Sequence, residues 1–464
     1  MFTDQVDIKS LTTAFIYAMG AVSVLFVVIG LGLIDMGVVR ARNVLDTWAQ
    51  KFTAAIVGGF GTLFFGYAIW QYQIYQAFGV PNALVQAFQD WWIGGGAAST
   101  AAIKLDPKVV PEADVQQIFL VFFVTFSMAT AALIHSSAIE RIKRAPLYVM
   151  SFLIGLIFSP LVGYLCWGPL SPLTNAGTHD FEGVFPLYIF SGTWSLILAW
   201  RLGPRSGALV PHPTGLKPTP SNQALVAAGV LFIFIAIPFV SLGSTWIIPD
   251  KGVYGISMTQ TGIGLIITNI FSAMLTGGVV GAIIGWSRKE VGWVFLGPIA
   301  GAVMGGTLFD IGTPLQCMVF GAIGPVVALG TARLTQALGL EEPKVVPLAL
   351  GPGILGAILV GFVHWGTPTG GFPGLTGNFA PGHAVITPYW QIAGVLATMA
   401  VAGIPAFILC LIFEKTSGLR IPAETELTGL DAAHWGVNNF GDDLGTATAS
   451  PLASGTGNIP AKAA

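Results

Sequence analysis

Residues 179–205 read "HDFEGVFPLYIFSGTWSLILAWRLGPR". Two carboxylates lie near the start of this segment, an apolar stretch follows them, and two arginines lie near its end. Asp180 and Glu182 come directly before the part that is apolar enough to cross a bilayer. A carboxylate in front of a helix accepts hydrogen bonds from the free N–H groups of the first turn and favours the positive end of the helix dipole. We therefore expect Asp180 to shape the mouth of a helix and add negative potential there, rather than bind a ligand directly.

Asp310, in "GGTLFDIGTP", is an acid at the end of another apolar stretch. A charged side chain at the centre of a membrane span costs roughly 2.5–3.5 kcal/mol on insertion scales, and less near the interface. Such an acid therefore caps a helix, pairs with another group or lines a wet cavity. Attraction of a cation into an outer vestibule is one form of the last alternative.

The sequence lacks the residues that catalysis or cofactor binding would require. We find no nucleophile–base pair, P-loop or metal-ligand spacing, so neither an enzyme nor a cofactor is expected. The three cysteines, Cys166, Cys317 and Cys410, each fall in an apolar stretch, which argues against a disulfide framework. A net charge of −2 gives no indication of a nucleic-acid partner.

The composition indicates that these residues are positioned by membrane helices. Hydrophobic residues make up 54% of the chain and charged residues only 9%, against about 25% charged residues in soluble domains. Apolar runs of about 18 residues or more are candidate spans. We predict an all-α polytopic protein with eleven spans, near 12–35, 52–74, 116–138, 146–167, 184–202, 223–244, 261–286, 292–311, 315–338, 345–365 and 390–413.

The positive charges support this count. With the N-terminus outside, sixteen of the twenty Lys and Arg residues fall inside, and only Lys9, Lys104, Lys108 and Lys251 fall outside. Cytoplasmic loops of membrane proteins are enriched in Lys and Arg. The distribution therefore predicts a multi-pass protein of the cell (inner) membrane, with its N-terminus outside and its C-terminus in the cytoplasm.

Eleven spans divide into two groups of five, plus one. Five and five in opposite orientation is a common transporter plan, the inverted repeat, with the substrate pathway between the halves near the midplane. The fifth and tenth spans would then hold equivalent positions. Residues 1–413 would form the transmembrane domain, and residues 414–464 a polar cytoplasmic tail.

Several motifs resemble the Amt/Mep/Rh ammonium transporter family. They are "LIDMGVVRARNVL" after the first span, "SSAIERIKRAPLYV" after the third, "DFEG" followed by "LGPR", and "GLRIPAETELTGLDAAHWG" in the tail. The tail match is the most specific, because no requirement of the membrane dictates it. The resemblance implies eleven spans with the N-terminus outside, and a homotrimer with one pore in each subunit.

The resemblance also implies roles for individual residues. Trp167 and Ser244 match the family's outer recruitment site for the ammonium cation, where an aromatic face offers about 0.5–2 kcal/mol. Asp180 matches the aspartate at the start of the fifth span. Two stacked phenylalanines close the entry in the family. Phe126 matches one of them, Val240 replaces the other, and Phe122 lies one turn from Phe126.

The chain departs from the family in the middle of the pore. The family has a histidine on each of the fifth and tenth spans, and the pair is thought to relay a proton while neutral ammonia passes. The matching positions hold Tyr188 and Leu350. Glu182 is a further departure, since small residues are usual there, and His135 and His364 match neither position of the pair. Tyrosine relays protons poorly at neutral pH and leucine not at all.

Three functions therefore remain open. The first is an ammonium or ammonia channel with a modified pore, and the second is the same scaffold conducting methylamine, a small amide or a dissolved gas. The third is an ammonium sensor that binds without transport. In the family this tail docks P-II signalling proteins, but Trp435 and Val437 replace residues expected in the tail's "HGE" stretch, which argues against P-II control.

Overall fold

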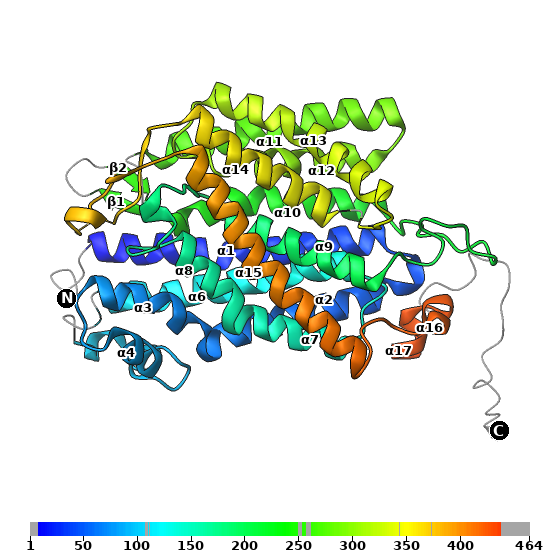
Figure 1. Ribbon diagram of the computed structural model, residues 1–464, viewed down its shortest axis with the longest axis horizontal. Helices are drawn as coiled ribbons and strands as arrows, with labels where there is room; N and C mark the ends of the chain where they lie inside the picture. Colours follow the sequence, from blue (N-terminus) through cyan, green and yellow to red (C-terminus); the bar gives the residue numbers. More distant parts are fainter. Residues whose placement is uncertain are drawn as a thin grey trace, which may run out of the picture.

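A computed structural model describes residues 8–106, 110, 112–248, 253–256, 261–342, 344–372 and 374–437. Long helices lie side by side along one axis, which is horizontal in Figure 1, and form an all-α bundle. The bundle helices are α1 (Ile8–Val38), α2 (Val44–Gly61), α3 (Tyr67–Ala77), α6 (Ala113–Ala138), α7 (Arg144–Leu153), α8 (Ser159–Cys166), α9 (Phe190–Leu202), α10 (Gln223–Val240), α11 (Ile263–Arg288), α12 (Val291–Gly305), α13 (Pro314–Ala337), α14 (Gly351–Val363) and α15 (Pro388–Lys415).

Short π-helical segments join some of these helices into longer spans. They are η2 (Thr62–Gly66), η4 (Ile154–Phe158), η6 (Val184–Ile189) and η9 (Val346–Leu350). Single π turns inside helices are often found at functional sites. η6 opens the fifth predicted span and η9 opens the tenth, so the two spans that the repeat makes equivalent begin in the same unusual way.

The described helices agree with the predicted spans. Nine are long and apolar enough to cross a membrane by length and composition. The two other predicted spans correspond to η6 with α9, and to the shorter apolar helix α12. A count of eleven spans is therefore consistent with the structure.

The two ends of the bundle differ. The short helices α16 (Ala423–Thr428) and α17 (Leu430–Trp435) lie at the right-hand end in Figure 1, called the tail end below. The opposite end carries α4 (Ala83–Asp90), α5 (Gly96–Ser99) and two antiparallel hairpins. β1 (Thr245–Ile248) pairs with β2 (Val253–Ile256), and β3 (Pro368–Thr369) pairs with β4 (Ala384–Val385).

Small residues let the helices approach closely, as is common in membrane bundles. At the crossing of α11 and α12, a Cβ added to Gly297 would lie 2.6 Å from the Gly277 carbonyl oxygen. A Cβ added to Gly277 would lie 2.7 Å from the Gly297 carbonyl oxygen. The two backbones are therefore in direct contact, which any larger residue would prevent.

Candidate functional site

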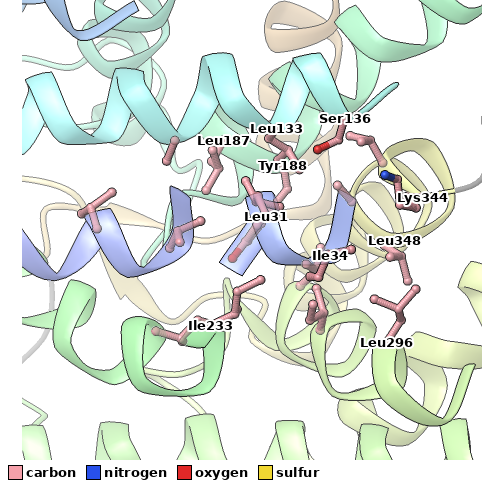
Figure 2. Close-up of a pocket in the computed structure, with 18 of the residues that line it drawn as sticks. Leu31, Ile34, Leu133, Ser136, Leu187, Tyr188, Ile233, Leu296, Lys344 and Leu348 are labelled. Atoms are coloured by element: carbon pink, nitrogen blue, oxygen red, sulfur yellow. The ribbon is translucent and has the colours of Figure 1, made fainter. Parts of the chain in front are cut away.

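A cavity of about 80 Å³ lies inside the bundle, between α1, α6, α10, α12, η6 and η9 (Figure 2). Val, Leu and Ile make up most of its wall. A water molecule occupies about 30 Å³ in the liquid, so the cavity has room for only a few small molecules. The polar side chains in its wall are Asp35, Ser136, Glu182, Tyr188 and Lys344.

Tyr188 and Glu182 form a hydrogen-bonded pair in the cavity wall. The Tyr188 hydroxyl donates to Glu182 Oε1 at 3.1 Å. Glu182 is 5% exposed, and its other oxygen, Oε2, has no hydrogen-bond partner among the described residues. The two residues that depart from the family pattern in this segment are therefore in contact with each other. Sequence reasoning identified each departure but not their pairing, since nothing in residues 182–188 alone shows how the side chains turn.

Asp180 caps η6, as expected of an acid in front of a helix. Its Oδ1 accepts from the N–H groups of Gly183 at 3.1 Å and Val184 at 2.9 Å, and its Oδ2 accepts from Phe185 at 3.1 Å. These bonds satisfy N–H groups that the first turn of a helix leaves free. The Asp180 side chain is 1% exposed and does not line the cavity.

Aromatic side chains gather near Glu182 and Tyr188. The rings of Phe126 and Trp167 lie 5.2 Å apart, edge to face, and those of Phe122 and Phe126 lie 6.0 Å apart. Phe126 and Val240 both line the cavity, whereas Phe122 packs against the backbone at Gly243. The structure thus brings the two predicted gate positions, 126 and 240, to one cavity.

The backbone of Trp167 is held by hydrogen bonds from α3. Trp70 Nε1 and Gln73 Nε2, both on α3, donate to the Trp167 carbonyl oxygen at 2.9 and 2.7 Å. The backbone of Ser244 ends the short 3₁₀ helix η7 (Ser241–Ser244), and its side chain lies outside the described residues. The predicted vestibule therefore has a fixed tryptophan in this structure.

Leu350 differs from its predicted place as a pore residue. It is 6% exposed and packs on α9, where a Cβ added to Gly192 would lie 2.6 Å from the Leu350 Cβ. Leu348 and Ala349, which belong with Leu350 to the π-helical segment η9, line the cavity in its place. His135 is buried on α6 and His364 ends α14, and neither lines the cavity.

Asp310 is paired rather than directed into the cavity. Its Oδ1 lies 2.8 Å from Nε2 of His179, and Nδ1 of His179 lies 2.9 Å from the Thr369 hydroxyl. Asp310 and His179 are 1% and 0% exposed. Of the alternatives for an acid in apolar surroundings, pairing is the one observed. His179, the residue before the capping aspartate, was not predicted as its partner.

Charged side chains lie at one side of the cavity, where Figure 2 shows Lys344 near Ser136, and Asp35 also lines the cavity. Lys344 and Lys51 both pair with the carboxylate of Asp35, Lys51 at 2.8 Å. Lys51 also donates to the Ser136 hydroxyl at 2.8 Å. The three charged side chains are nearly fully buried and together carry one net positive charge. Sequence reasoning missed this cluster, although Asp35 in the last turns of the first span was a signal.

A second buried network lies at the tail end and joins the family-like motifs. Glu140 of "ERIKR" accepts from Arg40 Nε at 2.9 Å and from Arg205 Nη1 of "LGPR" at 2.8 Å. Arg205 also pairs with Glu341 at 2.6 Å. Burial alone would raise the pKa of the Glu140 carboxyl, but the guanidinium groups of Arg205 and Arg40 outweigh it and lower that pKa to about 2.

The first part of the C-terminal segment docks onto this network. Arg40 donates to Glu426 at 3.2 Å, and the Ser206 N–H donates to Glu426 at 2.7 Å. Asp431 accepts from the N–H groups of Leu45 and Asp46, so it caps α2. Trp435 donates to Asp46 at 2.9 Å. The tail motif is therefore an integral part of the tail end.

Nearly the whole chain resembles known ammonium transporters in sequence. The model of the Ammonium Transporter Family matches residues 14–440. The ammonium transporter of Bacillus subtilis is 26% identical over 428 residues, which cover 89% of this chain and 95% of that relative. The ammonium transporter of Aquifex aeolicus is 27% identical over 431 residues and 92% of both chains.

Solved structures share the fold. A sensor Amt protein superimposes with a TM-score of 0.72 at 19% identity, over 92% of this chain and 99% of that one. Mep2 of Saccharomyces cerevisiae superimposes with a TM-score of 0.70 at 19% identity, over 91% of both. Together with a family match that spans nearly the whole sequence, these results show that the chain is a membrane protein that belongs to the Ammonium Transporter Family.

Proposed function

We propose that this chain moves ammonium or ammonia across the membrane through the cavity beside Tyr188, without a twin-histidine relay. The observation that carries the proposal is the cavity itself. It is apolar, it has Phe126 and Val240 in its wall, and it lies between the first and second groups of five spans. Away from its few polar side chains, a passage of this size suits a small neutral molecule better than an ion, because a bare ion in apolar surroundings loses its water without replacement.

The proposal includes the recruitment site outside the cavity. Trp167 would attract the cation through its ring, Ser244 would accept a hydrogen bond from it, and Asp180 would add negative potential while capping η6. Phe126, Phe122 and Val240 would form the entry, and Tyr188 with Leu348 and Ala349 the middle of the passage. Leu350 would pack behind the residues that line the passage. Asp310 would have no direct contact with the substrate and would hold His179 in place.

The proposal also covers the setting of the protein. We expect a homotrimer in the cell (inner) membrane, with the N-terminus outside and the tail end in the cytoplasm. Residues 1–413 would be the transporter domain and residues 414–464 the tail. The substitutions at Trp435 and Val437 argue against regulation by a P-II-type protein.

The test is transport by purified protein in proteoliposomes. Ammonium jumps on a supported membrane measure current, and an internal pH dye measures entry of the neutral base. We expect a protein-dependent pH change with ammonium that exceeds that of empty liposomes. Liposomes with protein that behave as empty ones in both assays would overturn the proposal.

One observation favours a second candidate, an ammonium receptor without flux. Asp35 and Lys344 line one side of the cavity, and together with Lys51 they form a positive cluster that would oppose passage of a cation. A receptor would be stabilised against heat by ammonium while showing neither current nor pH change. Methylammonium, a small amide and a dissolved gas serve as further test solutes in the same assays.

A further inference from the structure

We propose that Glu182 and Tyr188 form a binding site inside the cavity for a small alkylammonium-class cation, ammonium or methylammonium. This inference rests on the proposed function and names the groups that hold its substrate. Glu182 would supply the negative charge and Tyr188 would fix the carboxylate in place. The site lies deeper than the predicted recruitment site at Trp167.

The first argument is the missing counter-charge of Glu182. A buried carboxylate is strongly destabilised unless it is paired and hydrogen-bonded. Asp35, Glu140 and Glu341 all have Lys or Arg partners in this structure. Within the described part of the chain, Glu182 has none, and its one side-chain bond is the neutral hydroxyl of Tyr188. A bound cation would provide the absent charge.

The second argument is the free oxygen. Glu182 Oε1 accepts the Tyr188 hydroxyl proton, and the buried Oε2 has no partner among the described residues. Glu182 itself lines the cavity. Gly306 leaves room for the carboxylate, since a Cβ added there would lie 2.9 Å from Oε2. Oε2 is thus an acceptor without a donor, and the N–H groups of an ammonium ion are suitable donors.

The third argument concerns the kind of ligand. The Tyr188 oxygen donates to Glu182 and keeps a lone pair that can accept one N–H bond. The Phe126 ring is close by, because a Cβ added to Gly183 would lie 3.1 Å from its tip. Aromatic faces attract ammonium groups. A carboxylate, a phenol oxygen and an aromatic ring in a cavity of about 80 Å³ therefore suit a small nitrogen cation.

The charge at the other side of the cavity fixes the position of such a cation. Asp35, Lys51 and Lys344 carry one net positive charge there. Two like charges in surroundings of low dielectric repel each other strongly. A cation in the cavity is therefore most stable beside Glu182, away from the lysines.

The experiment titrates the full-length protein in detergent with ammonium chloride or methylammonium chloride, against potassium chloride at equal ionic strength, and follows thermal stabilisation. We expect saturable stabilisation of the wild type by both ammonium salts. Glu182→Gln keeps the shape and can still accept the Tyr188 proton, so we expect it to fold and to bind at least about tenfold more weakly. Tyr188→Phe should weaken binding by a smaller factor.

Two variants control for folding and for the chemistry changed. Tyr72→Phe removes a hydroxyl from a ring that stacks on Tyr164 outside the cavity, and Glu290→Gln removes an exposed carboxylate paired with Arg288. Both should bind as the wild type does. An unchanged apparent Kd in Glu182→Gln overturns the inference, as does a wild type that the two ammonium salts stabilise no more than potassium chloride does.

The transport assays separate this inference from the proposed function. If the wild type transports ammonium and Glu182→Gln transports it at the same rate and with the same KM, the proposed binding site is wrong. The proposed transport function is then retained. If ammonium binding depends on Glu182 but the protein shows no flux, the binding site is supported. The proposed transport function is then wrong, and the receptor is favoured.

Discussion

Asp180, Glu182 and Asp310, the three acids singled out from the sequence, are buried, and each is accommodated differently. Asp180 accepts three backbone N–H bonds, and Asp310 pairs with His179. Glu182 has only the Tyr188 hydroxyl. Because a buried carboxylate is costly without such partners, the first two are explained by structure alone. Of these three acids, Glu182 is the one whose side chain has neither a backbone N–H donor nor a basic partner among the described residues, which is why we assign it a ligand.

At the residue scale, we predict that Asp180→Ala destabilises the protein by about 1–3 kcal/mol, because buried N–H groups of η6 lose their acceptor. Asp180→Asn keeps one acceptor oxygen and should cost less. Thermal unfolding in detergent measures both. Equal stability of the wild type and Asp180→Ala would contradict the capping role.

A second prediction at this scale concerns recruitment. Trp167→Leu removes the ring that would attract the cation and should raise the KM for ammonium by about two- to thirtyfold, as expected for 0.5–2 kcal/mol. Phe126→Ala opens the entry and should change KM less. Concentration-dependent flux in proteoliposomes gives both values. Equal effects of the two substitutions would argue against a cation–π site at Trp167.

At the element scale, two features shape the site: the π turns and the glycine crossings. Within η9, Leu348 and Ala349 line the cavity and Leu350 packs against Gly192. The crossing of α11 and α12 holds α12 in place, and α12 supplies one wall of the cavity. Backbone geometry therefore decides which side chains the cavity presents.

We predict that Gly297→Ala destabilises the bundle by about 1–3 kcal/mol, because its Cβ would lie 2.6 Å from the Gly277 carbonyl oxygen. Gly292→Ala is the matched control on the same helix. A Cβ at Gly292 meets nothing within 4 Å, so this variant should be neutral or stabilised by up to about 1 kcal/mol. Thermal unfolding compares the two. A Gly297→Ala protein as stable as Gly292→Ala would show that the crossing tolerates a wider spacing.

At the scale of the whole molecule, the tail end connects parts that are distant in the sequence. Arg40, Glu140, Arg205 and Glu341 form one buried network, and Glu426 of the docked segment joins it through Arg40. Removal of one partner from such a network leaves a buried charge without compensation, which typically costs about 3–5 kcal/mol. α1 and α6 line the cavity, and the network that holds the tail includes Arg40 and Glu140, which follow directly after these two helices.

We predict that stability conferred by Glu140 depends on pH in a defined direction. Its pKa is lowered from 4.5 to about 2, so the stabilisation is complete above pH 4.5 and is lost as the pH falls toward 2. Limited proteolysis of the 416–437 segment across this range measures docking. Glu140→Gln should expose the segment already at pH 7 and reduce its pH dependence.

The control for this prediction is Glu290→Gln. Glu290 forms an exposed pair with Arg288, and such pairs contribute about 0–1 kcal/mol. Its proteolysis profile should follow that of the wild type. A Glu140→Gln protein with the same profile would show that the tail docks without this network.

Much of the molecule follows from the sequence because it depends on local composition. The lengths of apolar runs predict the helices, and described helices occupy all eleven predicted spans. An acid placed directly before a helix predicts the cap at Asp180, since donors and acceptor are at most five residues apart. Motif resemblance predicts the family, which the match over residues 14–440 confirms.

The contacts between distant residues were decided by tertiary structure alone. Asp35 and Lys344 meet across 309 positions, and His179 meets Asp310 across 131. Even the near neighbours Glu182 and Tyr188 form a pair that spacing alone did not predict, with Tyr188 in the π-helical η6 and Glu182 beside Gly306. Hydrophobicity determines which segments enter a membrane, whereas side-chain partners depend on how helices rotate and pack against one another. The rotation of each helix depends on many contacts along its length, so it cannot be predicted from a single sequence motif.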